Sequence, residues 1–427
     1  MGENSVKGRD HMEETKEVKE KALLVAADMG DYDVDISFAE LTELAEADDV
    51  EVVGEISQKR DTPEAGSYLG KGKLEEIKEM SSALEAELLI FDAELNATQI
   101  RNIEAITGVR TIDRTMLILD IFSSRARSSE GRVQVELARQ KYLLPRLSGM
   151  GKTLSRLGGG GGGGAGARRG AGETQLETDR RHIRRRIQVL EKDLEKMENR
   201  RSQMRLQRKK SEIPTIAIVG YTNVGKSTLI NALTGSEVEA KDMLFATLDP
   251  TARKLDLPDG RTAIIIDTVG LIRRLPHHLV EAFHSTLEEA ADADLILSVC
   301  DISSDEYPEQ IQVTQDILKD LGAEDVPVLT VYNKADLPHA PVDDGEKVAL
   351  ISAQTGEGLP ELLEKIQVLL PSGARKMRFL LPHDQVGLLN KIRQDGKVFQ
   401  EEYTEEGLLA EALVEPRYQK LVEPYEI

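Results

Sequence analysis

The chain has 427 residues, of which 40% are hydrophobic and 31% charged, which indicates a folded multidomain protein rather than a disordered chain. No apolar run reaches the roughly 18 residues of a membrane helix, and the single cysteine, Cys300, excludes an intrachain disulfide and a multi-cysteine metal site. The net charge of −21 argues against a uniformly basic surface, and the polar N-terminus favours a cytoplasmic protein over a secreted one.

The first part of the chain alternates between strand-like and helix-like patterns. After residues 1–20, which we expect to be a disordered lead-in, the predicted strands are 21–29, 50–56, 87–92 and 109–112, and the predicted helices are 38–47, 74–86 and 97–106. Alternation of this kind predicts a small parallel α/β domain, here over residues 21–113. No phosphate loop or catalytic cluster stands out in it.

A helical hairpin is expected over residues 114–212, with a glycine-rich loop at 158–172. Helical patterns at 114–126 and 129–144 precede seven consecutive glycines, which have no helix or strand propensity. Apolar residues then recur every seven positions, which predicts an a/d seam along one long helix. The seam consists of Leu176, Ile183, Leu190, Met197 and Met204, with Ile187 and Leu194 between them, and Arg180 and Arg201 interrupt it.

The hairpin is basic although the protein is acidic. Residues 121–210 hold 23 Lys and Arg against 9 Asp and Glu, a net of +14, so the rest of the chain carries −35. Two interpretations stay open at this point: a solvated helix face, or a surface that contacts a phosphate backbone. The glycine-rich loop is likewise either a linker or an arginine-bearing segment that reaches phosphates.

A nucleotide-binding domain is predicted over residues 213–371. The apolar strand 214–219 runs into Gly220-Tyr-Thr-Asn-Val-Gly-Lys-Ser227, and a helix is expected over 227–234. This is a phosphate loop in its required strand–loop–helix context. In such a loop backbone N–H groups surround the phosphates, Lys226 places a positive charge on them, and the Ser227 hydroxyl can bind Mg²⁺.

Three later segments at predicted strand ends complete the expected guanine-nucleotide site. Asp267-Thr-Val-Gly270 follows strand 263–267, where the carboxylate can hold Mg²⁺ through water and the Gly270 N–H can meet the γ-phosphate. Asn333-Lys-Ala-Asp336 follows strand 327–332, and its last carboxylate can accept two hydrogen bonds from guanine that adenine cannot supply. Ser352-Ala-Gln354 is placed to close over the base.

The sequence assigns no catalytic residue. Leu271 stands where small signalling GTPases usually carry a glutamine that orients the attacking water, and leucine cannot do this. Hydrolysis is therefore slow, or uses an unidentified residue, or depends on a partner. Thr247 is a candidate second Mg²⁺ ligand, although spacing alone equally fits an ordinary loop threonine.

Residues 372–427 predict a small α+β domain at the C-terminus. A strand at 377–381 and a helix at 385–392 precede a hairpin of strands 398–403 and 408–414, and we find no chemistry in it. The fold class is therefore a multidomain α/β protein: a parallel α/β domain, a coiled-coil-like hairpin, a P-loop domain and a small α+β domain.

Over about residues 20–370 the chain resembles the HflX family of translational GTPases. Beyond the phosphate loop, the resemblance is carried by Tyr68-Leu-Gly-Lys-Gly-Lys73, Asp113-Arg-Thr115, Leu117-Ile-Leu-Asp-Ile-Phe122, Glu130-Gly-Arg-Val-Gln-Val-Glu-Leu-Ala138, Gly172-Glu-Thr-Gln-Leu-Glu-Thr-Asp-Arg-Arg181 and Leu244-Phe-Ala-Thr-Leu-Asp-Pro-Thr251. The family implies the four-part architecture, binding to the large ribosomal subunit and its rRNA, and splitting or rescue of ribosomes. One departure is Ala171, which replaces a proline usual in the family's glycine-rich loop, and that loop is longer here.

The motifs and the resemblance together imply the following site. Mg²⁺ is expected on Ser227 and Thr247, with GTP or GDP as substrate or product. The expected nucleotide contacts are Gly220, Tyr221, Thr222, Asn223, Val224, Gly225, Lys226, Ser227, Thr228, Phe245, Ala246, Thr247, Leu248, Asp249, Asp267, Thr268, Val269, Gly270, Asn333, Lys334, Asp336, Ser352, Ala353 and Gln354. We expect a cytoplasmic monomer, peripherally associated with ribosomes. The alternative function is an RNA-remodelling or ribosome-assembly factor that uses GTP as a binding switch.

Overall fold

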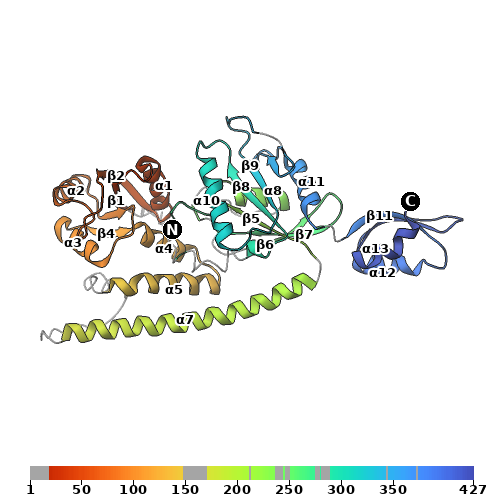
Figure 1. Ribbon diagram of the computed structural model, residues 1–427, viewed down its shortest axis with the longest axis horizontal. Helices are drawn as coiled ribbons and strands as arrows, with labels where there is room; N and C mark the ends of the chain where they lie inside the picture. Colours follow the sequence, from red (N-terminus) through yellow and green to blue (C-terminus); the bar gives the residue numbers. More distant parts are fainter. Residues whose placement is uncertain are drawn as a thin grey trace, which may run out of the picture. The chain divides into compact units, whose positions relative to one another are not determined.

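The structure is a computed structural model that describes residues 19–147, 171–210, 213–235, 244–245, 251–274, 279, 289–342, 345–371 and 374–427 (Figure 1). The chain separates into two compact units, residues 1–117 and 118–427. The division into four domains stays a prediction. None of the described helices is long and apolar enough to cross a membrane.

The first unit is built on a parallel sheet with strand order β2-β1-β3-β4. Its strands are β1 (Glu20–Asp28), β2 (Val50–Lys59), β3 (Leu88–Phe91) and β4 (Arg110–Asp113), and its helices α1 (Val34–Ala47), α2 (Lys71–Leu84) and α3 (Ala97–Thr107). The predicted alternation is confirmed. Helix α1 begins four residues before the predicted start because the Asp33 carboxylate caps it by accepting from the N–H groups of Asp35 and Ile36.

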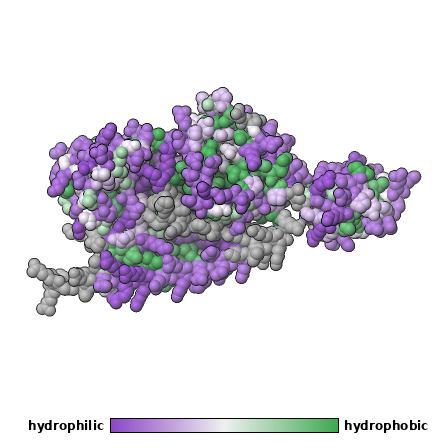
Figure 2. All heavy atoms as spheres, in the orientation of Figure 1, coloured by the Kyte–Doolittle hydropathy of each residue, from purple (hydrophilic) through white to green (hydrophobic). Residues whose placement is uncertain are grey.

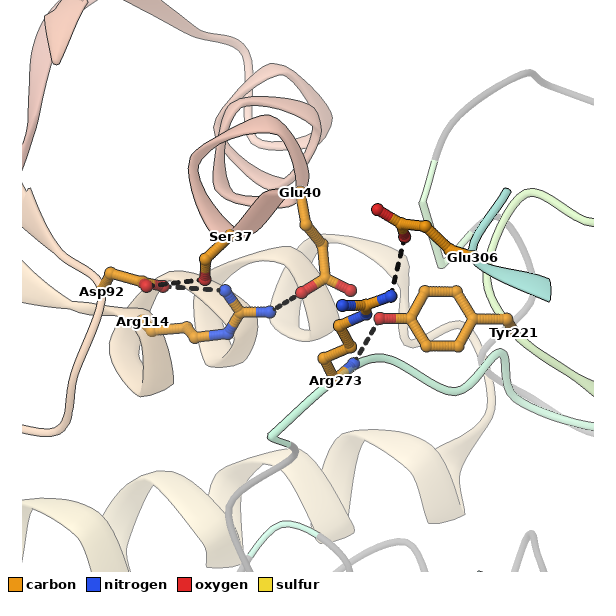
Figure 3. A network of polar contacts seen from close by, with 7 residues as sticks. All are labelled: Ser37, Glu40, Asp92, Arg114, Tyr221, Arg273 and Glu306. Atoms are coloured by element: carbon orange, nitrogen blue, oxygen red, sulfur yellow. Dashed lines mark hydrogen bonds and ion pairs between the residues drawn. The ribbon is translucent and has the colours of Figure 1, made fainter. Parts of the chain in front are cut away.

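A buried ionic cluster fixes the carboxyl end of β3 in this unit. Arg114 donates to Asp92 at 2.9 Å and also pairs with Glu40, while the Ser37 hydroxyl donates to Asp92 at 2.6 Å (Figure 3). Because a buried charge is costly unless it is paired, the cluster ties α1 to the strand end. The sequence pattern gave no sign of it.

Helices α4 (Arg114–Arg125), α5 (Ser129–Arg146) and α7 (Ala171–Lys210) follow. Helix α5 packs on α7, and the ion pairs Arg201–Glu130 at 2.9 Å and Lys141–Glu191 at 3.2 Å show that the two run antiparallel. Figure 2 shows that the described side chains along α7 are mostly hydrophilic on the face in view. The predicted hairpin arms are confirmed.

The predicted seam of α7 is confirmed from 180 to 201. The side chains of Arg180, Ile183, Ile187, Leu190, Leu194, Met197 and Arg201 are buried or half-buried, while most positions between them are exposed. The side chains of Leu176 and Met204 lie outside the described residues. Helix α7 begins at Ala171, so it takes in the last two residues of the predicted loop 158–172, a difference within the usual one- or two-residue scatter of helix ends. Residues 158–170 lie outside the described part.

The second unit holds a six-stranded sheet in the order β10-β9-β8-β5-β7-β6, in which only β6 runs antiparallel to its neighbour. The strands are β5 (Thr215–Gly220), β6 (Thr251–Asp256), β7 (Thr262–Asp267), β8 (Leu295–Asp301), β9 (Val328–Asn333) and β10 (Val348–Leu350), and the helices are α8 (Lys226–Thr234), α10 (Tyr307–Asp320) and α11 (Leu359–Leu369). The strands expected at 214–219, 263–267 and 327–332 are all present, as β5, β7 and β9.

The order of this sheet places the functional segments together. Strand β5 lies between β7 and β8, so the chain leaves β5 at the point where the strand order reverses, which is where α/β sheets bind ligands. Leu318 of α10 packs in one buried cluster with Ala217 and Val219 of β5. The carboxyl ends of β5, β7 and β9 therefore meet at one edge of a rigid, buried sheet.

The last part of the chain is a three-stranded antiparallel sheet, β11-β13-β12, with its own buried core. Its elements are β11 (Arg375–Leu381), α12 (Gly387–Asp395), β12 (Val398–Tyr403), β13 (Leu408–Val414), α13 (Pro416–Val422) and the 3₁₀ turn η1 (Glu423–Tyr425). The predicted strands and hairpin are confirmed, the predicted helix lies two to three residues further on, and α13 was not predicted.

Candidate functional site

The phosphate loop has the backbone that its glycines require. Gly220 has φ +155°, and a Cβ there would lie 2.2 Å from the carbonyl oxygen of Val299. Gly225 has φ +90°, and a Cβ there would lie 2.3 Å from Nδ2 of Asn333. Any side chain would therefore push neighbouring strands away from the loop. Helix α8 begins at Lys226, one residue before the predicted start, and ends at Thr234 as predicted, with Gly235 in the left-handed conformation as its C-cap.

The side chain of Lys226 is hydrogen-bonded to the backbone of the phosphate loop. Its ammonium group donates to the carbonyl oxygens of Gly220 at 3.1 Å and Tyr221 at 2.6 Å, and the side chain is 8% exposed. Burial lowers its pKa from 10.5 to about 8, although the Asp267 carboxylate acts in the opposite direction. The positive charge of the Lys226 ammonium group is thus positioned before phosphates bind, but the group loses its proton as the pH rises above about 8.

We expect nucleotide affinity to fall above pH 8. Because the free protein loses the Lys226 proton as pH rises through about 8, and a phosphate favours the charged amine, binding then requires proton uptake. GDP should bind about tenfold more weakly at pH 9 than at pH 7, since about one molecule in ten still carries the charge. Isothermal titration calorimetry across this range measures the change.

Guanosine is the matched control for this pH series. It keeps the base and lacks the phosphates, so its affinity should vary little between pH 7 and pH 8.5, where the GDP affinity already declines. Equal GDP affinities at pH 7 and pH 9 would contradict the proposed contact between Lys226 and the phosphates.

The segment after β7 lies on the phosphate loop. The Leu271 N–H donates to the Gly220 carbonyl at 3.1 Å, and the Thr222 N–H donates to the Leu271 carbonyl at 2.8 Å. A Cβ on Gly270 would lie 2.7 Å from Cγ2 of Thr222 and 3.1 Å from Nζ of Lys226. Asp267, Thr268 and Val269 are buried, and the Thr268 hydroxyl donates to the Ile218 carbonyl at 2.6 Å. The structure thus brings the Asp267–Gly270 segment to Lys226.

A further link between these segments was missed by the sequence analysis. Arg273 donates its N–H to the Tyr221 hydroxyl, and its guanidinium pairs with Glu306 at 2.8 Å (Figure 3). Tyr221, expected to contact nucleotide, therefore ties the loop to the segment beyond Leu271. A hydroxyl–backbone contact across 52 residues leaves no pattern in the sequence.

Asn333 joins the phosphate loop to the predicted base-binding segments. Its Nδ2 donates to the Val224 carbonyl at 2.8 Å, and its Oδ1 accepts from the Ala353 N–H at 2.9 Å. Lys334, with φ +65°, pairs with Asp301 at 2.6 Å. Ser352 and Ala353 are buried, whereas the side chains of Asp336 and Gln354 are exposed. The carboxylate of Asp336 is thus accessible to an incoming base.

The remaining predicted site residues divide into described and undescribed ones. Asn223 is exposed, Ser227 and Thr228 are half-buried, and Phe245 is buried. Ala246, Thr247, Leu248 and Asp249 lie outside the described residues. Hydroxyl and carboxylate oxygens are the ligands that Mg²⁺ prefers, so Ser227 at the start of α8 and the buried Asp267 at the end of β7 fit that ion.

Family models match three consecutive regions of the chain. A model described as "GTP-binding GTPase N-terminal" matches residues 35–123, one described as "GTP-binding GTPase Middle Region" matches 125–208, and one described as "50S ribosome-binding GTPase" matches 215–334. Together they cover most of the chain.

Curated relatives extend over nearly the whole length. The chain is 50% identical over 405 residues to a GTPase HflX of Caldanaerobacter subterraneus, covering 95% of this chain and 93% of that protein. It is 40% identical over 375 residues to the GTPase HflX of Escherichia coli, with 86% and 87% covered. A solved structure of a Sulfolobus solfataricus GTP-binding protein in complex with GDP is 27% identical, with 82% and 98% covered and a TM-score of 0.44.

Proposed function

The chain belongs to the HflX family of GTPases, and from this we propose that it binds the large ribosomal subunit in its GTP-bound state and promotes the splitting or rescue of ribosomes. The protein binds GTP and hydrolyses it. The proposed partner is a ribonucleoprotein, so we also propose that it acts in the cytoplasm, as a monomer that associates peripherally with ribosomes.

The observation that carries this proposal is the basic hairpin on an otherwise acidic protein. Residues 121–210 have a net charge of +14, and the side chains of Arg184, Arg185 and Arg186 on α7 are exposed. Exposed guanidinium groups suit the phosphates of rRNA, because each contact releases counterions. The rRNA phosphates would repel the acidic remainder of the chain, so the hairpin is the part of the protein that suits RNA.

We propose that the loop amides and Lys226 hold the phosphates, and that Asp336 selects guanine. Asn333 joins the phosphate loop to the base-binding segment through its hydrogen bonds with Val224 and Ala353. Mg²⁺ held by Ser227 and Thr247, and by Asp267 through water, would neutralise charge that develops on the phosphates. Leu271 is 1% exposed and has no polar side-chain atom, so water would be oriented by another group or with a partner's help.

Sedimentation of ribosomes with the purified protein tests the proposed function. With a non-hydrolysable GTP analogue the protein should migrate with the large subunit, and with GTP it should increase the proportion of free subunits. With GDP it should remain at the top of the gradient. Binding only to immature particles, without any change in the proportion of free subunits, would instead support the RNA-remodelling or assembly function.

Charge reversal on α7 should weaken binding to the ribosome. Replacing Arg184, Arg185 and Arg186 by Glu removes exposed cations, so the affinity for the large subunit should fall by at least about tenfold at 100 mM salt. The slope of log affinity against log salt should become shallower, because fewer counterions are released. Filter binding at several salt concentrations measures both quantities.

The control variant changes the net charge by the same amount as the α7 variant, but in the first unit of the chain. Lys71, Lys78 and Arg101 are exposed residues of the first unit, and their replacement by Glu should leave the salt slope close to that of the parent. If both triple variants alter the slope equally, the effect comes from overall charge and the proposed contact face is wrong.

A further inference from the structure

Thr222 of the phosphate loop carries a buried hydroxyl group that no described residue pairs with. The residue is 6% exposed, and its Oγ1 has no hydrogen-bond partner within the part of the chain that the structure describes. A buried polar group without a partner destabilises a folded protein, and the large majority of buried side-chain polar atoms are therefore paired. A hydroxyl at this place needs a reason other than stability.

The fold of the loop does not require this hydroxyl. The phosphate-loop pattern leaves the position of Thr222 open to other residues. The contacts that hold the residue come from its backbone and its methyl group: its N–H donates to the Leu271 carbonyl at 2.8 Å, and its Cγ2 would lie 2.7 Å from a Cβ on Gly270. Valine has nearly the same shape and keeps the backbone N–H. The loop could therefore form equally well with valine, which indicates that the hydroxyl serves a ligand.

The neighbours of Thr222 are the groups that we expect at the terminal phosphate. A Cβ on Gly270 would lie 3.2 Å from Cα of Thr222 and 3.1 Å from Nζ of Lys226, so Thr222 and Lys226 both lie against Gly270. In phosphate loops the lysine reaches the β- and γ-phosphates, and the Gly270 N–H is expected to meet the γ-phosphate. A threonine hydroxyl can donate to a phosphate oxygen. The unpaired donor therefore lies among the groups that would surround the γ-phosphate.

We propose that Thr222 is a specificity-determining residue: its hydroxyl donates to the γ-phosphate of GTP, and the protein thereby distinguishes GTP from GDP. This rests on the proposed placement of the phosphates at the loop amides and Lys226. Because GDP lacks the γ-phosphate, the hydroxyl gains a charged acceptor only when GTP binds. The hydroxyl thus adds to the preference for GTP what it does not contribute to the stability of the free protein.

Replacement of Thr222 by valine separates this role from a structural one. We expect the ratio of the affinities for guanosine 5′-(β,γ-imido)triphosphate and GDP to fall about tenfold to a hundredfold in Thr222→Val, as for loss of one hydrogen bond to a charged group. Thr222→Ser keeps the hydroxyl and should keep the parental ratio. Without nucleotide, the thermal midpoint of Thr222→Val should equal or exceed that of the parent, because a methyl group replaces an unpaired buried hydroxyl.

Isothermal titration calorimetry of the full chain with Mg²⁺ measures both affinities, and Thr314→Val is the matched control. Thr314 is 2% exposed on α10 in the same unit, and its hydroxyl donates to the Gln310 carbonyl at 2.9 Å. The same substitution there removes a buried hydroxyl that already has a partner within its own helix. The ratio of the two affinities should therefore stay at the parental value.

Three results would overturn the proposal: a parental ratio in Thr222→Val, including an equal weakening of both nucleotides; an equal loss in Thr222→Ser; or a lower thermal midpoint in Thr222→Val, which would give the hydroxyl a structural role. Lys226→Ala, measured alongside, should weaken both nucleotides. If it does so while Thr222→Val keeps the parental ratio, only the assignment of Thr222 is wrong. If Lys226→Ala binds both nucleotides like the parent, the placement of the phosphates is wrong as well. Ribosomes are absent throughout, so the sedimentation test is independent of these outcomes.

Discussion

Replacement of Asp336 by Asn should change the preferred base from guanine to xanthine. The carboxylate is exposed at the end of the Asn333–Asp336 motif, where it can accept from the N1–H and the exocyclic amine of guanine. An asparagine keeps one acceptor but presents its amide N–H₂ to the guanine amine, while xanthine offers an oxygen there. GTP affinity should fall at least about a hundredfold, because two charge-assisted hydrogen bonds are lost and a donor faces a donor.

Competition binding with GDP and xanthosine diphosphate measures this change. The variant should prefer xanthosine diphosphate, and the parent GDP. Asp320→Asn, which removes another exposed carboxylate, at the end of α10, should behave like the parent. Parental GTP affinity in Asp336→Asn would show that the base is read elsewhere.

Basal hydrolysis should be slow and strongly accelerated by large ribosomal subunits. The phosphate-binding parts are in place, whereas Leu271 supplies no group that could orient water. Positioning by a partner is worth about three powers of ten or more in related phosphoryl transfers. Ser227→Ala removes the proposed Mg²⁺ ligand and should abolish both basal and stimulated turnover.

Single-turnover hydrolysis with and without purified large subunits tests this expectation. Thr234→Ala is a control in the same helix: its hydroxyl donates to the Ile230 carbonyl at 2.8 Å in the last turn, and its loss should leave both rates near the parental values. A fast basal rate that large subunits do not change would contradict the proposal.

The part of the site that the sequence could predict is the part encoded locally. The run 214–227 specifies a buried strand, a glycine-rich turn and a helix within fourteen residues, and β5 and α8 follow it closely. The seam of α7 was predictable for the same reason, since a seven-residue period is a local signal. Strand β6 was missed because Thr251–Asp256 is a mostly polar edge strand with one buried residue, Leu255.

The contacts that join distant segments could not be predicted. Asn333 is 109 residues from Val224 and 20 residues from Ala353, and the Phe122 and Phe245 rings meet across a stretch of chain that holds α5, α7, β5 and α8. Each depends on which side chains the completed sheet and helices bring within reach. A motif can place Asn333 at a strand end, but its partners follow only from the strand order β9-β8-β5.

Arg201, one of the two arginines that interrupt the seam of α7, has a consequence for how the hairpin aligns. In an apolar heptad repeat, sliding one helix by seven residues restores most of the packing, so apolar residues alone leave several alignments close in energy. Arg201 and Glu130, only 18% and 23% exposed, pair in one of them. If one helix slid along the other, the charges of Arg201 and Glu130 would stay half-buried but would no longer pair with each other. The ion pair therefore selects a single register, although two apolar residues at these positions would stabilise the core more. The length of each arm beyond that pair is thereby fixed.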